Sequence, residues 1–384
     1  MDMLNSLVQS NPTPYYAYDL GRLKQTIDRA KKASERYGYH VHYAMKANAN
    51  DNILACFLKA GFGIDCVSGQ ELQKALDSGF HAEQIAFAGV GKSDWEIDLA
   101  LNNGIFTLNV ESIEELIVIN ERAKRLGKNA KIALRLNPDV NAKTHHYITT
   151  GLEENKFGIS EWQLNELFDC LETLEYVKLT GIHFHIGSQI TSLEPFRNLC
   201  SRINHFQELF ESRGFRLEHI NAGGGLGVDY DHPDDLNKPN FDGFFELFSK
   251  FLQLRPYQSL HFELGRALVA QSGDLISRVL YVKKGRKTNF VILDAGMTEL
   301  IRPALYQAFH KIENISQFNS KPTEFYDVVG PVCESSDCFG KAVNLPKTER
   351  GDLVAIRSAG AYGECMASSY NMRSLNPSFF YEAE

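Results

Sequence analysis

The chain has 384 residues, of which 40 are Lys or Arg and 48 are Asp or Glu, so its formal net charge is −8. Hydrophobic residues make up 43% and charged residues 23%, a composition that is ordinary for a globular protein and too apolar for a disordered one. A net negative chain without a long run of Lys and Arg is a poor candidate for binding nucleic acid or acidic membrane surfaces.

The predicted elements begin with a strand at 13–18 and a helix at 20–36. From Gly38 to Arg266, short β-rich runs then alternate with segments whose apolar residues have helical spacing. Eight such repeats with right-handed crossovers favour a (β/α)8 barrel of TIM type, with an open doubly wound sheet as the alternative. The eight predicted strands are 40–46, 62–67, 85–88, 106–110, 131–136, 179–186, 217–221 and 259–263.

Four joints between these strands and the helices that follow carry the capping-box pattern. In this pattern a Ser accepts a hydrogen bond from the start of a helix, and a Glu or Gln three residues later reaches back to the Ser. The four predicted boxes begin at Ser68, Ser93, Ser112 and Ser160.

After Arg266 the long helical segments stop. Residues 275–282, 289–294, 324–329 and 353–358 predict strands, which indicates a separate mostly-β domain of β-sandwich or β-barrel type. We therefore predict a barrel over 20–266 and a second domain over 1–19 and 267–384 that contributes to the active site. The polar stretch 229–240 predicts a surface loop.

The cellular location is predicted from three absences. The first residues lack the basic and apolar regions of a signal peptide. No apolar run approaches the roughly 20 residues that span a bilayer. Seven cysteines at irregular spacing do not suggest a secreted disulfide framework. We expect a cytoplasmic protein.

In a barrel of this type, catalytic groups lie where the strands end. Lys46 lies at such an end, on one strand face with His42 and Ala44. Desolvation in this apolar run disfavours the ammonium form and favours a nucleophilic amine that forms a Schiff base. The alternative is a strand-end lysine whose ammonium reaches water.

Two histidines end the sixth strand. His183 and His185 share a face there, so they provide either a platform for a ring or a pair of metal ligands. No third ligand is evident beside them, and a hydrogen-bonded core histidine is the alternative.

Three glycines, 223–225, follow the seventh strand. Such a run lets backbone N–H groups turn toward an anion, at the usual phosphate position of this architecture. The G-x-G-x-x-G spacing of dinucleotide-binding proteins is absent, and a plain tight turn is the alternative.

Glu263 and Arg266 close the eighth strand. A carboxylate that ends a buried strand needs a partner, which a protonated ring nitrogen would provide, and Arg266 suits a phosphate or a carboxylate. An internal Glu–Arg pair is the alternative. Together the four features supply what pyridoxal phosphate requires: a Schiff-base lysine, a ring platform, a phosphate cradle and an acid for the pyridine nitrogen.

These motifs resemble the group III pyridoxal-phosphate decarboxylases, the barrel family shared with ornithine decarboxylase and alanine racemase, over residues 13–371. In this family the motif that corresponds to Glu263–Arg266 is usually Glu-Pro-Gly-Arg, so Leu264 stands where the family has a rigid proline. The resemblance implies that Lys46 binds the cofactor covalently and that His185 stacks on its ring. The other implied cofactor residues are Ser188, Gly223, Gly224, Gly225, Glu263, Gly265, Arg266 and Tyr362.

The second domain indicates the substrate. Residues 330–335, Gly-Pro-Val-Cys-Glu-Ser, match the motif of the family branch that decarboxylates meso-2,6-diaminopimelate to L-lysine and CO2, the last step of lysine biosynthesis. The resemblance implies that Cys333 donates a proton and that Glu334 binds the far ammonium, both in the partner's barrel of a homodimer. The resemblance implies that Arg302 and Tyr306 hold the far carboxylate and that Arg266 and Tyr362 also bind the substrate.

Other interpretations stay open from residue type alone. Cys333 also fits a small buried residue, Arg302 and Glu334 fit surface charges, and both tyrosines fit core aromatics. Rival functions are decarboxylation of ornithine, arginine or carboxynorspermidine, racemisation, non-catalytic pyridoxal-phosphate binding, and metal-dependent hydrolysis through His183 and His185. The Cys-Glu-Ser motif and Glu263 favour diaminopimelate decarboxylation.

Overall fold

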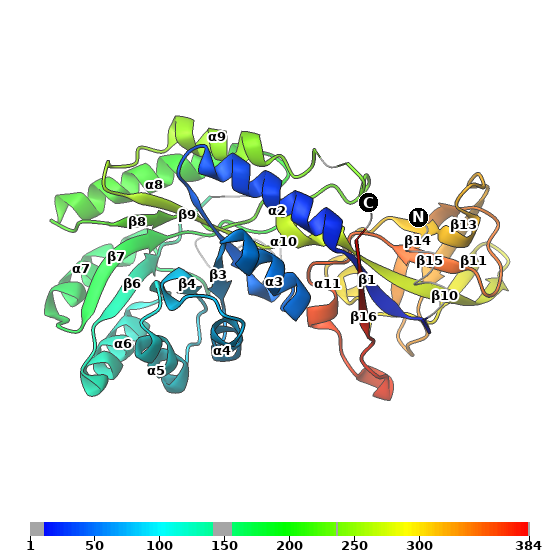
Figure 1. Cartoon of the computed structure of the whole chain (residues 1–384), viewed down its shortest axis with the longest axis horizontal. Coiled ribbons are helices and arrows are strands. Elements are labelled where there is room, and N and C mark those ends of the chain that lie inside the picture. Colours follow the sequence, from blue (N-terminus) through cyan, green and yellow to red (C-terminus); the bar gives the residue numbers. More distant parts are fainter. Residues whose placement is uncertain (1–10, 141–155, 236, 383–384) are drawn as a thin grey trace. The chain divides into compact units, whose positions relative to one another are not determined.

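The computed structural model describes residues 11–140, 156–235 and 237–382 (Figure 1). Internal contacts divide the chain into two compact units. The barrel unit comprises Ile27–Gly227 and Pro239–Gly265, and the β unit comprises Met1–Thr26, Val228–Lys238 and Arg266–Glu384. In the described ranges no helix combines the length and the apolar character that a bilayer span requires.

The barrel unit is built on eight parallel strands that close on themselves in chain order, as the (β/α)8 prediction requires (Figure 1). The strands are β2 (His40–Ala44), β3 (Gly63–Cys66), β4 (Ile85–Phe87), β5 (Thr107–Val110), β6 (Ala130–Arg135), β7 (Val177–His183), β8 (His219–Asn221) and β9 (Ser259–Leu264). The α-helices before and between them are α2 (Leu20–Glu35), α3 (Asp51–Ala60), α4 (Gly69–Asp77), α5 (Asp94–Asn103), α6 (Ile113–Leu126), α7 (Leu164–Thr173), α8 (Glu194–Ser212) and α9 (Phe241–Phe251).

Two strands end earlier than the alternating sequence pattern indicates. β2 ends at Ala44, and Lys46 lies in the 3₁₀ helix Met45–Ala47 that follows. β7 ends at His183, so His185 lies in the loop beyond it. The predictions that Lys46 and His185 share a strand face with their neighbours are therefore wrong.

The predicted capping boxes form in two versions. At Ser93 and Ser160 the Glu or Gln three residues later accepts from the backbone N–H of the cap residue itself. At Ser68 and Ser112 the Ser accepts from the start of the helix, but the Glu accepts from the residue before the cap. In this second version the carboxylate ties the end of the preceding strand to its helix.

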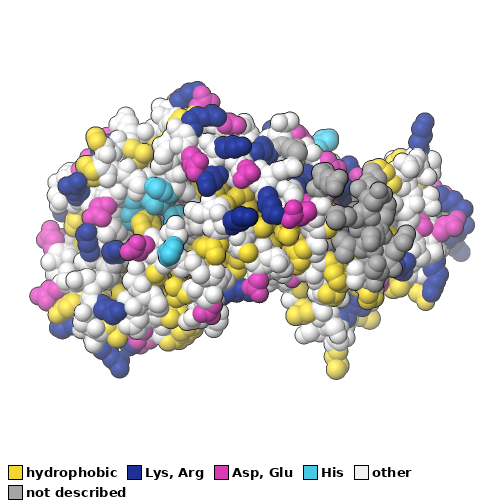
Figure 2. Space-filling model, viewed as in Figure 1, with side chains coloured by type: hydrophobic (Ala, Val, Ile, Leu, Met, Phe, Trp, Pro, Cys, Tyr) yellow, Lys and Arg dark blue, Asp and Glu magenta, His cyan; other side chains and the backbone are white. Residues whose placement is uncertain are grey.

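A layer of imidazoles and one phenyl ring fills part of the barrel interior. We call His42, His219, His261 and Phe106 the histidine layer; ring centroids of Phe106 lie 4.7 Å from those of His219 and His261. His42 Nε2 lies 2.9 Å from His261 Nδ1, and all three histidines are buried. His42 and His261 also line a pocket of about 550 Å³ with the exposed His40, and Figure 2 shows histidine side chains gathered on the visible face of the barrel unit.

The β unit is built on a sheet in the order β12-β15-β10-β11-β13-β14, with β1 pairing β10 and β16. Its strands are β1 (Tyr15–Asp19), β10 (Gly273–Lys284), β11 (Asn289–Leu293), β12 (Ile312–Asn314), β13 (Glu324–Val329), β14 (Cys338–Leu345), β15 (Leu353–Ile356) and β16 (Ser378–Tyr381), and its α-helices are α10 (Arg266–Val269) and α11 (Arg302–Tyr306). This is the mostly-β part that the sequence predicted. Because β12 is short and β14 contains Gly340 and exposed polar residues, these strands gave no sequence signal.

Candidate active site

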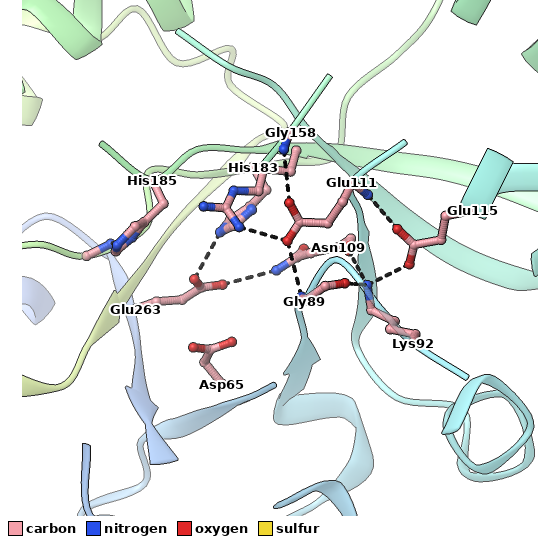
Figure 3. A network of polar contacts seen from close by, with 12 residues as sticks. Asp65, Gly89, Lys92, Asn109, Glu111, Glu115, Gly158, His183, His185 and Glu263 are labelled. Carbon is pink, nitrogen blue, oxygen red and sulfur yellow. Dashed lines mark hydrogen bonds and ion pairs between the residues drawn. The ribbon is translucent and has the colours of Figure 1, made fainter. Parts of the chain in front are cut away.

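The residues predicted to bind the cofactor ring lie at the carboxyl ends of the barrel strands. Parallel strands of a barrel share one such end, so groups far apart in the sequence meet there. Lys46 follows β2, His183 ends β7, and Glu263 lies next to last in β9. We call the polar side chains at this end the strand-end cluster: Lys46, Asp65, Asn109, Glu111, Arg135, His183, His185, Asn221 and Glu263. Figure 3 labels six of them, namely Asp65, Asn109, Glu111, His183, His185 and Glu263.

Glu263 is the buried centre of the cluster. Its Oε2 lies 2.9 Å from His183 Nε2, and its Oε1 accepts hydrogen bonds from Asn109 Nδ2 at 3.1 Å and Asn221 Nδ2 at 2.7 Å. Figure 3 shows His183 and Asn109 pointing toward this carboxylate. Burial by itself would raise the pKa of Glu263, but His183 and Lys46 outweigh burial and hold it well below its usual range. The carboxylate is therefore ionised.

Lys46 lies beside a second buried carboxylate. Its Nζ lies 3.2 Å from Asp65 Oδ2, with the lysine side chain 38% exposed and the Asp65 side chain fully buried. The predicted desolvation of the amine is therefore wrong, since this lysine reaches solvent and has an acidic neighbour. Burial and the charge of Glu263 raise the pKa of Asp65 to about 8, although Lys46 opposes the shift.

His185 is a neutral ring placed against the glycine loop. Burial, together with Arg135 and Lys46, lowers the pKa of His185 well below its ordinary value. Its Nδ1 accepts from the Gly224 N–H at 3.3 Å. His183 contacts Glu263 instead, and within the described residues no group of three His, Cys, Asp or Glu side chains is arranged to hold a metal ion. The interpretation of the two histidines as a metal pair is not supported.

The glycine run is shaped by backbone packing. A Cβ on Gly224 would lie 1.9 Å from the carbonyl oxygen of Glu263, and one on Gly223 would lie 2.0 Å from that of Phe184. The Gly223 N–H donates to Asn221 Oδ1 at 2.9 Å, and the Gly224 N–H donates to His185. These two N–H groups therefore already have partners inside the protein, contrary to the expectation that both face an anion.

The remaining predicted barrel residues lie in or beside the same loops. Ser188 is half-buried in the loop after β7, and Gly265 is buried between β9 and α10. Leu264 is buried and is the last residue of β9, with Tyr43 as its register partner in β2. The strand therefore continues past Glu263 where the family carries a proline.

The sequence did not reveal two buried ion pairs, Arg135 with Glu111 and Lys92 with Glu115 (Figure 3). Glu111 accepts from Arg135 Nη1 at 2.7 Å and from two backbone N–H groups, those of Gly89 and Gly158. Lys92 Nζ donates to the backbone carbonyl of Asn109 at 2.7 Å. Lys92 thereby fixes the backbone of Asn109, whose side chain donates to Glu263.

In the β unit, Arg266 and Arg302 meet on a buried tyrosine. Arg266 Nη1 donates to the Tyr230 hydroxyl at 2.7 Å, and the Arg302 guanidinium lies 5.1 Å from the Tyr230 ring centre. Burial would raise the pKa of Tyr230, but the two arginines hold it below its ordinary value. Tyr230 lies in the stretch predicted to be a surface loop, so that prediction is wrong for this residue.

Arg302 is a buried cation and not the surface charge that residue type alone allows. It is 4% exposed, and burial is the main reason that its pKa is lowered. Its Nη1 lies 2.7 Å from His310 Nε2, and its Nε has no hydrogen-bond partner within the described residues. Such a group is suited to bind an anion. Tyr306 is half-buried at the end of α11, and the Tyr362 ring centre lies 4.9 Å from the Arg266 guanidinium.

Cys333 and Glu334 are exposed at the tip of a tight turn. The buried Asp337 carboxylate accepts from the backbone N–H groups of Val332 and Met297, both at 2.6 Å, and so fixes the base of the turn. The Cys333 N–H donates to the Asn371 side chain. The exposure of Cys333 excludes its interpretation as a small buried residue.

The donor set of the strand-end cluster fits pyridoxal phosphate. A partly exposed primary amine, Lys46, lies among buried polar groups, and the Glu263 carboxylate is surrounded by hydrogen-bond donors. Asp65 Oδ1 is buried and without a hydrogen-bond partner in the described residues, so the cluster retains hydrogen-bonding capacity for an incoming group.

Comparisons with known proteins agree with this chemistry. Residues 20–270 match the model of the pyridoxal-dependent decarboxylase family, pyridoxal binding domain. Diaminopimelate decarboxylase from Bacteroides thetaiotaomicron is 57% identical over 364 residues, which cover 94% of each chain.

Solved structures extend the likeness to the whole fold. The crystal structure of diaminopimelate decarboxylase from Helicobacter pylori complexed with L-lysine is 41% identical, has a TM-score of 0.92, and is matched over 99% of this chain and 94% of its own. The M. jannaschii enzyme in co-complex with L-lysine is 37% identical, with a TM-score of 0.90 over 98% and 89% of the two chains. The chain therefore belongs to the family of pyridoxal-dependent decarboxylases that includes these diaminopimelate decarboxylases, and its cofactor is pyridoxal phosphate.

Proposed function

We propose that this chain decarboxylates meso-2,6-diaminopimelate to L-lysine and CO2 with pyridoxal phosphate. The observation that carries the proposal is the buried, ionised Glu263 in the same strand-end cluster as the amine of Lys46, in a chain whose relatives over nearly its full length are diaminopimelate decarboxylases. An ionised carboxylate suits decarboxylation because it keeps a ring nitrogen protonated.

The barrel residues are assigned to the cofactor. When bound, pyridoxal phosphate supplies an electron-poor ring that accepts the electron pair left by departing CO2. Lys46 would supply the amine for the cofactor aldehyde, Glu263 would hold the proton at the ring nitrogen, and the neutral His185 would provide the platform for the ring. The phosphate is assigned to Ser188, Gly265, Arg266, Tyr362 and the loop 223–225. Within this loop Gly225 is the candidate donor, because the N–H groups of Gly223 and Gly224 already donate to side chains of the protein.

The β unit supplies the groups for the substrate. Arg302 suits the far carboxylate because it is a buried cation whose Nε lacks a hydrogen-bond partner among the described residues. Tyr306 and Tyr362 are assigned to the same substrate-binding site, and Glu334 is assigned to the substrate's far ammonium group. The Cys333 thiol would supply the proton for the α-carbon of the product, and the Lys46 amine would be the group that binds the cofactor aldehyde when no substrate is present.

Cys333 and Glu334 are assigned to the partner's barrel in a homodimer. Exposed apolar side chains accompany them: Met372 is 97% exposed and Leu375 is 66% exposed, and Tyr370, which donates to Glu334, is half-exposed. Exposed apolar side chains close together favour a protein interface. We assign the enzyme to the cytoplasm, which the absence of disulfides among the seven cysteines of the described ranges supports.

Product analysis tests the function directly. The purified protein is incubated with meso-diaminopimelate and, in separate reactions, with ornithine and arginine, and the amines are identified by chromatography. We expect L-lysine and CO2 from the first reaction only. Faster turnover of ornithine or arginine would assign the chain to another decarboxylase of the family.

The cofactor assignment has its own test. The protein as purified should absorb above 400 nm, borohydride should bleach that band, and peptide mass spectrometry should place the reduced adduct on Lys46. A bleached adduct with no turnover of any of the three amino acids would indicate a non-catalytic pyridoxal-phosphate protein.

A further inference from the structure

The Glu263 carboxylate is held by three donors from three different strands. Asn109 comes from β5, His183 from β7 and Asn221 from β8, and the donor atoms lie between 2.7 and 3.1 Å from the carboxylate oxygens. All three side chains are almost fully buried. An ionised carboxylate offers about four acceptor positions, so three donors leave it about one more.

Two of these donors keep another polar atom unsatisfied. Nδ1 of His183 and Oδ1 of Asn109 are buried and have no hydrogen-bond partner within the described residues. A buried polar atom without a partner destabilises the fold. The bonded nitrogens of His183, Asn109 and Asn221 all meet at one carboxylate, so the arrangement is directed at Glu263 and not at general packing.

We infer that His183, Asn109 and Asn221 are positioning residues for the cofactor's ring nitrogen, which act by fixing the one acceptor position of Glu263 that stays open. This inference rests on the proposed assignment of Glu263 to that nitrogen. His183 carries most of the effect because it alone donates to Oε2, whereas the two asparagines share Oε1. Without the His183 donor the carboxylate of Glu263 is free to rotate, so its open acceptor position is no longer held toward the ring nitrogen.

The experiment measures cofactor binding and not turnover. The apo-protein is titrated with pyridoxal phosphate and with the analogue in which C–H replaces the ring nitrogen, and the ratio of the two dissociation constants is compared between variants. His183→Asn removes the Nε2 donor because its shorter amide does not reach Glu263, whereas His183→Gln restores an N–H donor at the longer distance. His219→Asn is the matched control, since His219 is also a buried strand histidine whose Nε2 finds no hydrogen-bond partner in the described part of the chain.

The wild-type protein and His219→Asn should prefer pyridoxal phosphate over the analogue by the same factor. His183→Asn should lower that preference by about tenfold, the usual worth of a charge-assisted hydrogen bond, and His183→Gln should recover most of it. If His183→Asn does not fold, Asn221→Ala and Asn109→Ala provide the same measurement, each with a smaller expected loss.

The outcomes separate this inference from the assignment on which it rests. An unchanged preference in His183→Asn, or in both asparagine variants, overturns the positioning role while the assignment of Glu263 stands. If the wild-type protein binds the two compounds equally, Glu263 does not contact the ring nitrogen, and the assignment itself fails.

Discussion

Acid should destabilise the barrel unit through the histidine layer. The Gln84 carbonyl only accepts, so His42 Nδ1 carries a proton and donates to it at 3.1 Å. His42 Nε2 is then the acceptor for His261 Nδ1–H, and His261 Nε2 accepts from the Ser259 hydroxyl at 2.8 Å. This chain is satisfied when both rings are neutral, because a proton added to His42 Nε2 would face another N–H.

The size of the effect follows from the pKa values. Burial is the main cause that lowers the pKa of His42 from 6.5 to about 4 and that of His219 from 6.5 to about 3. Because these folded values lie below the ordinary one, the unfolded chain takes up the protons first, and stability is full above pH 6.5 and falls below it. Between pH 8 and pH 5 each of the two histidines should cost about 2 kcal/mol of unfolding free energy.

The assay is urea unfolding at pH 8, 6.5 and 5, followed by tryptophan emission. Both tryptophans, Trp95 and Trp162, lie in the barrel unit, so their signal reports this unit alone. The comparison is between the wild-type protein and His219→Asn, which lacks one titrating ring. The raised pKa of Asp65 acts in the opposite direction, but it is common to both proteins and cancels in their difference.

The variant should lose about 2 kcal/mol less than the wild-type protein between pH 8 and pH 5. Equal losses in the two proteins would show that His219 is not buried as a neutral ring, and the reasoning from the histidine layer would then be wrong.

Three further predictions concern the site. Lys46→Ala should bind no cofactor that survives dialysis, seen as loss of absorbance above 400 nm, and retention of that band would refute the lysine assignment. Cys333→Ala should keep the absorbance but lower kcat by roughly 10²–10⁴, the usual worth of a positioned general acid, and near-normal turnover would contradict its role. Gly224→Ala should destabilise the apo-protein by more than about 3 kcal/mol, because its Cβ would lie 1.9 Å from the Glu263 carbonyl oxygen; an unchanged urea midpoint would exclude this packing.

The barrel was predictable because its strands are apolar runs between helices with clear start signals. The ends of the strands were not predictable, because an alternating apolar pattern indicates which residues are buried and not which residues pair with a neighbouring strand. Met45 and Ala47 continue the alternation after β2, since both are buried in the 3₁₀ helix. Phe184 and Ile186 do the same after β7.

The ring-binding residues with unusual chemistry were predictable, and their polar partners were missed. Asp65, Asn109 and Asn221 each lie in the last two positions of a short apolar strand, a signal that becomes visible once the strands are known to share one end. Tyr230 gave no such signal, because it stands between Asp229 and Asp231 and its burial depends on arginines far away in the sequence.

The glycine loop has a consequence for how this enzyme is to be tested. Cβ atoms at Gly223 and Gly224 would collide with backbone carbonyls of neighbouring strands and not with a bound ligand. Any side chain at these positions is thus selected against even in a barrel that never holds a phosphate. Invariance of the two glycines among relatives would report on folding, and only changes to the ligand, such as a phosphate-free pyridoxal, can reveal whether the loop recognises an anion.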